Sequence, residues 1–589
     1  MGILISTVRI YRFRGIENIE IDLDKSTVLT GMNNSGKTSF LKALQVVFGN
    51  KNFLSTDDFN IKNKILAEKI IIDVLIKPAN GEDFSEDWEI LFTTDRIRYD
   101  QDANSFIPLR TVVTYDPIKN SYKTEQFIQN EWPKYESEGS YWYEQVNGNP
   151  TIFYFDEIPF FYVNAQRDII EDTKLKNSYL GKMLSRIEYS EEDIKEIENG
   201  IEGLNQKAVD SSTILTSIKA SLKGLDTAMS SRGSGIEITP FTKKIRDLNK
   251  GMTIYYSDTD ESFSMEYHGM GTRSWSSLLT LKAFISLLEN NSKKEERVFF
   301  PILAIEEPES HLHPNAQKKL YRQMNEICGQ KIISTHSPYI AACADLKQIR
   351  NFYKAQELCV GSAAFISLNN EELRKINRQV INTRGEIFFS KFIVFFEGET
   401  EEQALPILFE KYFGMNPVEA GVDFIGVGGY EGYSPFLNFA KQFNIPNIIL
   451  SDADNVNITN KVTAQHKKVY GDESTESKVI FLDAGNDYEK QLVTDGFQDE
   501  IRCAILSLKV YTNEKHKEVQ MPCDEATVAA MDDDALYKSM YTAKTQMAPT
   551  VAEQIVKSDK GLPDTVANVF KFIMETLKRE GSLSNEELN

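Results

Sequence analysis

Apolar and polar residues alternate along the beginning of the chain. Val8–Phe13 and Ile19–Leu23 place apolar side chains at every second position, and Lys69–Lys77 is a β-branched run. A period of two and β-branched runs predict β-strands. A further short strand, Thr27–Thr30, leads into a glycine-containing loop, after which a helix is expected at Ser39–Phe48. The N-terminal region is therefore expected to be a mixed α/β domain.

From about Asp168 to Met229 the pattern changes. Apolar residues recur there at helical spacing among many Lys, Glu and Ser residues, which predicts a helical insertion. Strands are expected again afterwards, at Phe299–Ile305 and Lys331–Ser334, with a helix from Pro314 between them.

A second alternation of strands and helices begins near residue 385. Strands are expected at Phe392–Phe396, Asp423–Val427 and Asn447–Leu450, with helices at Glu401–Tyr412 and Ser434–Phe443 between them. Strands that alternate with helices favour a parallel sheet. The chain after about residue 500 is mostly helical in pattern.

Length and composition are those of a multidomain globular protein. At 589 residues the chain is too long for a single hydrophobic core, and its composition is 41% hydrophobic and 26% charged. No apolar run approaches the ~20 residues of a membrane span, and the N-terminus does not resemble an export signal. The five cysteines form no C-x-x-C pair, which argues against a zinc site and predicts a reducing, cytoplasmic location.

The formal net charge of −21 argues mildly against an extended nucleic-acid-binding face, which is usually basic. Any path for DNA must therefore be a local basic groove. Two small basic clusters, one around Arg374 and Arg378 and one around Lys243, are candidates.

A complete phosphate-binding motif lies in the N-terminal region. It follows a strand and opens a helix, which is the context that this motif requires. The glycines let backbone N–H groups surround phosphates, Lys37 supplies a cation to the β/γ oxygens, and Thr38 ligates Mg²⁺. The predicted ATP-binding residues of this loop are Gly31, Asn33, Asn34, Ser35, Gly36, Lys37, Thr38 and Ser39.

A second motif, Phe299–Pro308, is an apolar strand that ends in two carboxylates. In a Walker B arrangement, Glu306 would hold the Mg²⁺ shell, and Glu307 would orient or deprotonate the attacking water. The segments Glu309–Pro314 and Ser334–Pro338 follow soon after and favour this interpretation over an ordinary strand with acidic ends.

With these motifs in order, the chain resembles ABC-type ATPases of the SMC and recombination-repair kind, and more closely the ATPase half of the OLD (overcoming lysogenization defect) family. The resemblance implies that His336 senses the γ-phosphate and that residues 309–314 form the D-loop. Residues 268–274 stand where the signature segment belongs, with Gly271 and Thr272 as predicted nucleotide contacts.

The signature segment departs from the common LSGGQ form, so it stays open whether Thr272, Arg273 or Ser274 contacts the γ-phosphate. ABC sites are composite, with one subunit's phosphate loop facing another's signature. Because this chain has one of each, the resemblance implies a homodimer, with the helical insertion as a candidate dimer contact.

The C-terminal half carries acids at the ends of two predicted strands. Glu397 and Glu401 follow the first, and Asp452 and Asp454 follow the last. This order is similar to the Toprim signature. Parallel strands bring such acids to one edge of a sheet, where they repel one another unless a divalent cation binds. Oxygen ligands of this kind favour Mg²⁺ or Mn²⁺.

Further residues extend the resemblance to the nuclease half of the OLD family. Glu397 and Glu401 match its E-G-x-x-E pattern, which implies one metal, with Asp452 anchoring it. Asp454 and Glu489 would complete a second metal site, and Lys560 would stabilise the charge on the scissile phosphate. The mechanism implied is two-metal phosphodiester hydrolysis.

The expected fold class is α/β, with an ABC-type (P-loop) ATPase, a helical dimerisation insertion and a Rossmann-like Toprim domain. The expected boundaries are ATPase 1–167, insertion 168–230, ATPase 231–350, linker 351–384, and Toprim with a helical C-terminal part 385–589.

The expected function is an ATP-binding, metal-dependent endonuclease that cuts double-stranded DNA under nucleotide control. Similarity to the nuclease subunit of Gabija systems and to retron-associated nucleases implies a role in bacterial anti-phage defence. The same similarity implies a homodimer or larger homo-oligomer and a helicase, or a retron reverse transcriptase with its non-coding DNA, as partner.

Two alternatives stay open at this point. One is an ATP-driven DNA-clamping or repair protein whose Toprim module does not cut. The other is a topoisomerase or primase, although none of the 25 tyrosines stands in a recognisable nucleophile context.

Overall fold

The structure is a computed structural model of the 589-residue chain. It describes residues 2–49, 54–62, 65–81, 83–116, 121–135, 142–144, 148–174, 190–222, 255–256, 263–355, 358–361, 368–381, 385–472, 474 and 477–579. The chain divides into two compact units, one formed by residues 1–154 and 332–589 and the other by residues 155–331. Within the described ranges, no helix combines the length and apolar character needed to cross a membrane.

The first unit begins with an antiparallel sheet in the order β10-β9-β8-β6-β1-β2, with β7 paired to β8. Strand β6 lies inside the sheet, between β1 and β8. Its side chains are buried along nearly its whole length, so both of its faces are covered. Within this sheet Arg110 and Asp73 form a fully buried ion pair at 2.6 Å. The strands are β1 (Ile3–Phe13), β2 (Ile16–Asp22), β6 (Lys69–Pro78), β7 (Arg98–Tyr99), β8 (Ser105–Asp116), β9 (Ser121–Gln129) and β10 (Gly148–Thr151).

A second group of strands in this unit leads to the phosphate-binding motif. Strand β3 (Ser26–Gly31) is buried throughout and pairs in parallel with β16 (Ile349–Ala355), which is antiparallel to β17 (Leu358–Gly361). Helix α1 (Lys37–Phe48) follows β3 and buries Phe40, which contacts Phe352 of β16 edge-to-face. The predicted strand, loop and helix are confirmed.

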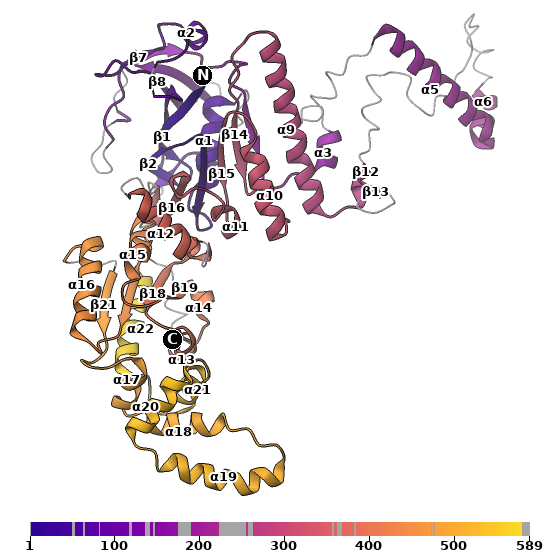
Figure 1. Ribbon diagram of the computed structural model, residues 1–589. Coiled ribbons are helices and arrows are strands. Elements are labelled where there is room, and N and C mark those ends of the chain that lie inside the picture. The colour runs from indigo at the N-terminus through magenta and orange to yellow at the C-terminus, as the bar shows by residue number, and fades with distance from the viewer. Residues whose placement is uncertain are drawn as a thin grey trace, which may run out of the picture. The chain divides into compact units, whose positions relative to one another are not determined.

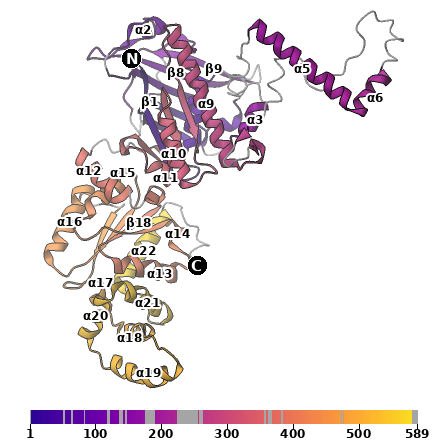
Figure 2. The ribbon, with the colours of Figure 1, turned by 45° about the vertical axis from the view of Figure 1, so that its right-hand side comes forward.

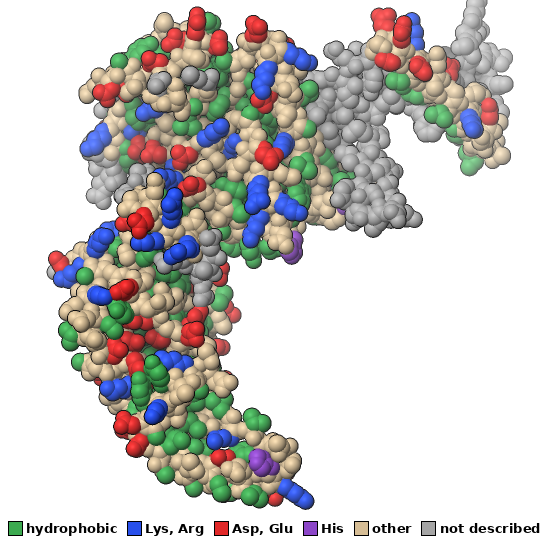
Figure 3. All heavy atoms as spheres, in the orientation of Figure 1, with side chains coloured by type: hydrophobic (Ala, Val, Ile, Leu, Met, Phe, Trp, Pro, Cys, Tyr) green, Lys and Arg blue, Asp and Glu red, His purple; other side chains and the backbone are tan. Residues whose placement is uncertain are grey.

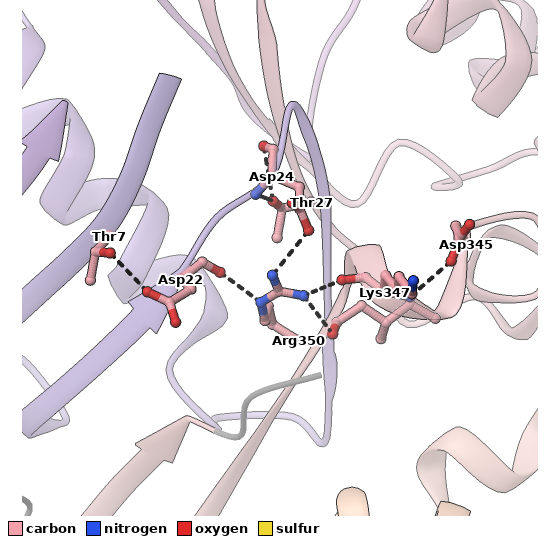
Figure 4. Close-up of polar contacts among 8 residues, drawn as sticks. Thr7, Asp22, Asp24, Thr27, Asp345, Lys347 and Arg350 are labelled. Atoms are coloured by element: carbon pink, nitrogen blue, oxygen red, sulfur yellow. Dashed lines mark hydrogen bonds and ion pairs between the residues drawn. The ribbon is translucent and has the colours of Figure 1, made fainter. Parts of the chain in front are cut away.

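Arg350 fixes β16 beside the turn that precedes β3 (Figure 4). Its guanidinium donates to the carbonyl oxygens of Asp22 and Lys347, each at 2.6 Å, and lies 3.1 Å from an Asp24 carboxylate oxygen. Asp22 in turn accepts a hydrogen bond from Thr7 of β1 at 2.8 Å. One buried cation therefore joins segments that are far apart in the sequence.

The unit formed by residues 155–331 contains the second ATPase motif. Strands β11 (Phe160–Val163) and β14 (Ile302–Glu306) pair in parallel, and the long helix α9 (Met270–Lys294) lies beside α10 (Pro314–Asn325) (Figures 1 and 2). Trp275 of α9 donates to Gln323 of α10 at 2.8 Å. Strands β12 (Tyr255–Tyr256) and β13 (Phe263–Ser264) form a small antiparallel pair.

The helical insertion is confirmed where the structure describes it. It contains α3 (Ile169–Lys174), α5 (Glu191–Ser211) and α6 (Thr213–Leu222). Residues 175–189 and 223–254 lie outside the described residues, and so does the predicted basic cluster around Lys243. The dimer contact assigned to the insertion stays a prediction.

A second α/β layer structure lies in the first unit, after residue 385. Its four strands are all parallel, in the order β19-β18-β20-β21. Phe392, Val394 and Phe396 of β18 join the core that also holds α13 and α22, whereas Phe395 points to the other face and packs on Phe436 of α15. The strands are β18 (Phe392–Phe396), β19 (Val422–Gly426), β20 (Asn447–Ser451) and β21 (Ser477–Phe481), and the helices of this layer are α13 (Glu399–Phe413), α15 (Tyr433–Gln442), α16 (Val456–Tyr470) and α22 (Asp564–Arg579).

Helices complete the C-terminal part, as the sequence predicts. They bury apolar residues in the same core as α13, including Leu492, Leu536 and Val551. These helices are α17 (Tyr488–Thr494), α18 (Gln498–Ser507), α19 (Glu514–Ala529), α20 (Asp533–Thr542) and α21 (Lys544–Lys557). The remaining short elements are α2 (Glu86–Phe92), α11 (Pro338–Ala341), α12 (Asn370–Ile376), α14 (Pro417–Ala420), β4 (Ile61–Lys62), β5 (Ile65–Leu66) and β15 (Gln330–Ser334).

Candidate functional site

The loop between β3 and α1 is shaped by glycine and holds a buried lysine. Gly31 has a φ of +130°, and a Cβ at this position would lie 2.1 Å from the carbonyl oxygen of Phe352. The Nζ of Lys37 donates to the carbonyl oxygens of Gly31 at 2.8 Å and Met32 at 2.9 Å. Asn33, Asn34 and Thr38 are exposed, whereas Ser35 is buried and Gly36 caps the helix.

His336 lies close to this loop. Burial, and secondly the positive charge of Lys37, lowers the pKa of His336 to about 4. The imidazole is therefore neutral near pH 7, with one nitrogen that donates and one that accepts a hydrogen bond. The structure thus brings together Lys37 and His336, which the sequence assigned to the same phosphate. Contact of His336 with a nucleotide stays a prediction.

The two acids of the predicted Walker B motif, Glu306 and Glu307, lie at the end of β14 in the other unit. Tyr162 of β11 donates its hydroxyl to Glu306 Oε2 at 2.9 Å, and Glu307 has a φ of 41°. The Nη2 of Arg167 donates to the carbonyl oxygen of Pro308 at 2.5 Å. Burial lowers the pKa of Arg167 to about 10, opposed by the nearby Glu309 and Glu307. Tyr162 and Arg167 were not identified from the sequence, because neither belongs to a motif with fixed spacing.

The signature segment begins helix α9, with Gly269 as its N-cap. A Cβ on Gly271 would lie 2.5 Å from the carbonyl oxygen of His311, so a glycine is needed where this helix meets the predicted D-loop. Arg273 is ion-paired with Asp168, and Ser274 is buried. Thr272 is half-buried, as is Arg273, so which of these residues contacts the γ-phosphate stays a prediction.

Four of the predicted acids meet at the carboxyl edge of the parallel sheet. Glu397 follows β18, Glu401 lies in the first turn of α13, Asp452 follows β20, and Glu489 lies in the first turn of α17. Burial, followed by the charges of Glu401 and Glu397, raises the pKa of Asp452 to about 9. Burial, and secondarily Glu489 and Glu397, raises the pKa of Glu401 to about 7. This mutual effect places the four carboxyl groups in one acidic cluster.

The fifth predicted acid, Asp454, is exposed at the rim of the acidic cluster. Its charge raises the pKa of Glu397, after the larger effect of burial. Asp487, two residues before Glu489, also raises the pKa of Asp452 and accepts a hydrogen bond from Tyr537 at 2.9 Å.

Hydrogen bonds occupy some carboxylate oxygens of the acidic cluster and leave others free. Glu397 Oε1 accepts from Ser451 at 2.8 Å, and Glu489 Oε1 accepts from Thr400 at 2.7 Å. The buried Oδ1 of Asp452 has no hydrogen-bond partner in the described part of the chain. In that part no three acidic, His or Cys side chains are arranged to ligate one ion as they stand. The donor chemistry nevertheless fits a divalent cation, because carboxylate oxygens are its preferred ligands and its charge would offset the buried repulsion.

Two lysines of the C-terminal half bear on the predicted phosphate contact, and the sequence prediction named only Lys560. Lys560 donates to the carbonyl oxygen of Gly496 and lies 5.1 Å from the ring centroid of Phe497. Lys544, at the start of α21, lies 2.9 Å from Glu489 Oε1 and lowers the pKa of Glu401. Lys544 was missed because no motif marks it in the sequence. The role assigned to Lys560 stays a prediction, but Lys544 is the lysine found against the predicted acids.

Surface charge is mixed on the face shown in Figure 3. Acidic side chains gather there over the region labelled α22 and α17 in Figure 1, and blue side chains are scattered among them. Of the predicted basic cluster near residue 374, Lys375 is paired with Glu371 at 3.1 Å on an exposed helix.

Comparisons with known proteins agree with this division of the chain. A family model described as an AAA ATPase domain matches residues 4–341, and one described as the TOPRIM domain of overcoming lysogenization defect-like proteins matches residues 388–454. The chain is 25% identical to "Endonuclease GajA" of Bacillus cereus (strain VD045), over 76% of this chain and 75% of that protein.

Two further relatives cover similar shares. The "OLD nuclease" of Thermus scotoductus is 24% identical over 77% of this chain and 82% of its own length. The "Old nuclease" of Escherichia phage P2 is 22% identical over 84% of both chains. The predicted order of an ATPase followed by a Toprim domain in an α/β chain is confirmed.

Proposed function

Because the chain belongs to the AAA ATPase-domain family and carries an OLD-like TOPRIM domain after it, we propose that it is a DNA endonuclease that cuts phosphodiester bonds under nucleotide control. The relatives named endonuclease GajA and OLD nuclease support a nuclease activity for this chain. Double-stranded DNA is the proposed substrate.

The acidic cluster is the observation that carries this proposal. Asp452 has a pKa of about 9 because burial and the surrounding carboxylates penalise its charge. A group of buried acids this costly has no structural benefit of its own, since unpaired buried charges destabilise a fold. The cluster is therefore best explained as a cation-binding site used in catalysis.

Divalent metal would be held by Glu397, Glu401 and Asp452 on one side, and by Asp454 and Glu489 on the other. Mg²⁺ or Mn²⁺ bound there would supply the activation of water and the neutralisation of charge on the leaving 3′ oxygen. The chain's own contribution is to position the acids: Ser451 holds Glu397, and Thr400 holds Glu489 through the same oxygen that Lys544 contacts. Both contacts are made by Oε1 of Glu489.

We assign to Lys544 the cationic role that the sequence gave to Lys560. Its ammonium lies 2.9 Å from Glu489 and is half-exposed, so it can reach a phosphate brought to the acidic cluster. A lysine at this position would stabilise the charge that develops on the scissile phosphate.

ATP is the proposed nucleotide. Lys37, Thr38 and His336 would hold its phosphates in the first unit, and Glu306 and Glu307 would serve the magnesium ion and the attacking water. Control of cutting by ATP and a homodimer built from composite sites rest on the ATPase-domain membership. Anti-phage defence, with a helicase or a retron component as partner, rests on the family resemblance of the sequence motifs.

The test is incubation of the purified chain with supercoiled plasmid and Mg²⁺ or Mn²⁺, with and without ATP. We expect wild type to nick or linearise the plasmid, Glu397→Ala to leave it intact, and Lys37→Ala to lose any effect of ATP. Asp472→Asn, which changes an exposed acid outside the acidic cluster, is the matched control. Intact plasmid with wild type under all these conditions contradicts the proposal.

The competing function is an ATP-driven DNA clamp with a non-cutting Toprim module. It predicts that wild type retains DNA in an ATP-dependent way without cutting it. The burial of Asp452 among other acids argues against this alternative, because a module that binds no metal gains nothing from a carboxyl group whose ionisation is so costly.

A further inference from the structure

A pocket opens beside the acidic cluster, between the loop 427–432 and the first half of α16. Its volume is about 460 Å³, within the range of roughly 300–1,000 Å³ that is typical of small-molecule sites. Tyr430, Asn457, Asn460 and Lys461 contribute to its lining, and none of the lining side chains is acidic. This amide-rich lining, with Lys461 as its one charged residue, contrasts with the acidic cluster next to it. We call it the Tyr430 pocket.

The loop that carries Tyr430 is hydrogen-bonded to Glu397. Gly429 has a φ of +105°, and its N–H donates to the carbonyl oxygen of Glu397 at 3.1 Å. The backbone of Tyr430 forms a hydrogen bond with the Glu397 carboxylate itself, which lowers the pKa of that group. A Cβ on Gly432 would lie 2.3 Å from the carbonyl oxygen of Val427, so the loop turns back tightly. Tyr430 therefore contacts a predicted metal ligand with its main chain while its side chain lines the pocket.

The two walls of the Tyr430 pocket are tied together. Gln465 of α16 donates to the carbonyl oxygen of Tyr430 at 2.7 Å and accepts from the backbone N–H of Ser434 at 3.1 Å. Lys461 lies 2.6 Å from Glu431 and 5.0 Å from the centroid of the Tyr430 ring. The pocket is therefore formed before any ligand arrives, and anything bound in it lies next to Glu397.

The lining chemistry favours a base over a phosphate. Asparagine amides both donate and accept, which matches the edges of nucleobases, and a tyrosine ring can stack on a base face. The one cation in the lining, Lys461, is already paired with Glu431. A phosphate would find one cation here, whereas a base would find several amide groups and an aromatic ring.

We propose that the Tyr430 pocket receives a nucleobase of the DNA strand next to the scissile phosphate, so that binding and cutting depend on the identity of that base. This inference rests on the proposed nuclease function for its DNA ligand. Asn457 and Asn460 contact the edge of the base, and Tyr430 contacts its face. The hydrogen bond between the loop and Glu397 fixes the position of the bound base relative to the acidic cluster.

The experiment uses a pool of random-sequence DNA duplexes and two separate readouts. The first sequences the duplexes that the full chain retains in Ca²⁺, where binding is measured without relying on cutting. The second sequences the ends of the products made in Mg²⁺. We expect one position to be biased in both readouts, by roughly fivefold or more, which is the low end for one good side-chain contact to a base edge.

Variants connect that bias to the pocket. Asn457→Ala and Asn460→Ala are expected to reduce the base bias at least severalfold. Tyr430→Ala is expected to weaken DNA retention, whereas Tyr430→Phe should preserve both the bias and the retention because it keeps the aromatic ring. Lys468→Ala, an exposed lysine on the same helix outside the pocket lining, is the matched control and should behave as wild type. Asn457 and Asn460 are exposed, so their replacement should not impair folding, which thermal unfolding checks.

The outcomes separate this inference from the proposed function. If DNA is cut but the product ends are unbiased, or if the bias is unchanged in both asparagine variants, the base-binding inference is wrong and the proposed nuclease function is supported. If DNA is retained with an asparagine-dependent bias but is never cut, the proposed nuclease function is wrong and the base-binding inference is supported. Equal loss of retention for all sequences in Lys461→Ala, with no base bias in wild type, identifies a phosphate contact and overturns the base-binding inference.

Discussion

At the scale of single residues, the positions of Lys544 and Lys560 predict that only one of the two lysines is needed for cutting. Lys544→Met is expected to reduce cutting by roughly a hundredfold or more, because it removes a charged donor from the site where phosphate charge develops. Lys560→Met is expected to have little effect, since that lysine bonds to the carbonyl oxygen of Gly496. The measurement is the initial rate of plasmid nicking in Mg²⁺.

The opposite result would restore the sequence-based assignment. If Lys560→Met abolishes cutting while Lys544→Met cuts normally, Lys560 must reach the phosphate in the DNA-bound state. Thermal unfolding of both variants separates a lost role in cutting from lost folding.

The raised carboxyl pKa values predict a pH-dependent stability. A carboxyl group whose pKa is raised by folding binds its proton more tightly in the folded chain, so stability falls as pH rises from the unfolded to the folded pKa. For Asp452, with a folded pKa of about 9, and Glu401, with one of about 7, this loss extends from about pH 4 upward to these values. Metal-free protein should therefore have a lower Tm at about pH 8 than at about pH 6 through these groups.

A divalent cation should reverse this trend. It binds the ionised carboxylates and competes with protons, so Mg²⁺ or Mn²⁺ should raise the Tm more at about pH 8 than at about pH 6. Asp452→Asn should reduce both the pH trend and the metal effect, whereas Asp472→Asn, at an exposed site, should preserve them. A metal effect on Tm that is equal at both pH values in wild type would contradict this account of the acidic cluster.

At the scale of elements, Arg350 is expected to hold β16 in place. Arg350→Met would leave the carbonyl oxygens of Asp22 and Lys347 without their charged donor, and hydrogen bonds of this kind contribute about 1.5–3 kcal/mol each. We expect the free energy of unfolding of the first unit, measured by urea denaturation, to fall by at least about 1.5–3 kcal/mol, the contribution of one such bond. Lys123→Met, which breaks an exposed ion pair with Glu125, should change stability by less than about 1 kcal/mol.

The same change tests how β16 supports the phosphate loop. Phe352 of β16 lies against Gly31 and against Phe40 of α1, so displacement of this strand should also weaken ATP binding. An Arg350→Met variant that is as stable as wild type would show that the network in Figure 4 is dispensable.

At the scale of the whole molecule, nucleotide binding and association should be linked. ATP or a non-hydrolysable analogue is expected to raise the free energy of unfolding by about 2.7 kcal/mol at a hundred times its Kd. Lys37→Ala should abolish this shift because it removes the buried cation of the loop, whereas Lys42→Ala, on the same helix, should retain it.

Light scattering provides the second measurement at this scale. A composite site predicts that wild type associates further when the nucleotide is added and that Lys37→Ala does not. Thr272→Ala should bind the first nucleotide normally and fail to associate, because its predicted contact is with the partner's phosphate. Association that is the same with and without nucleotide would contradict the composite site.

The sequence by itself determined the features that depend on local spacing. The phosphate loop requires residues 31–38 in one fixed order, and strand periodicity located β18 and β20 with their acids at the carboxyl ends. Parallel pairing then requires Glu397 and Asp452 to lie at the same edge of the sheet. These predictions held because neighbouring residues along the chain suffice to specify them.

Only the tertiary structure decided which distant residues join these motifs. Lys544 contacts Glu489, Tyr430 is bonded to Glu397, and Arg350 reaches Asp22, yet no periodicity or spacing marks any of them. Their positions follow from the packing of α21, the turn of the glycine loop and the pairing of β16 with β3. Such contacts depend on how whole elements pack in three dimensions, which a pattern along one sequence does not specify.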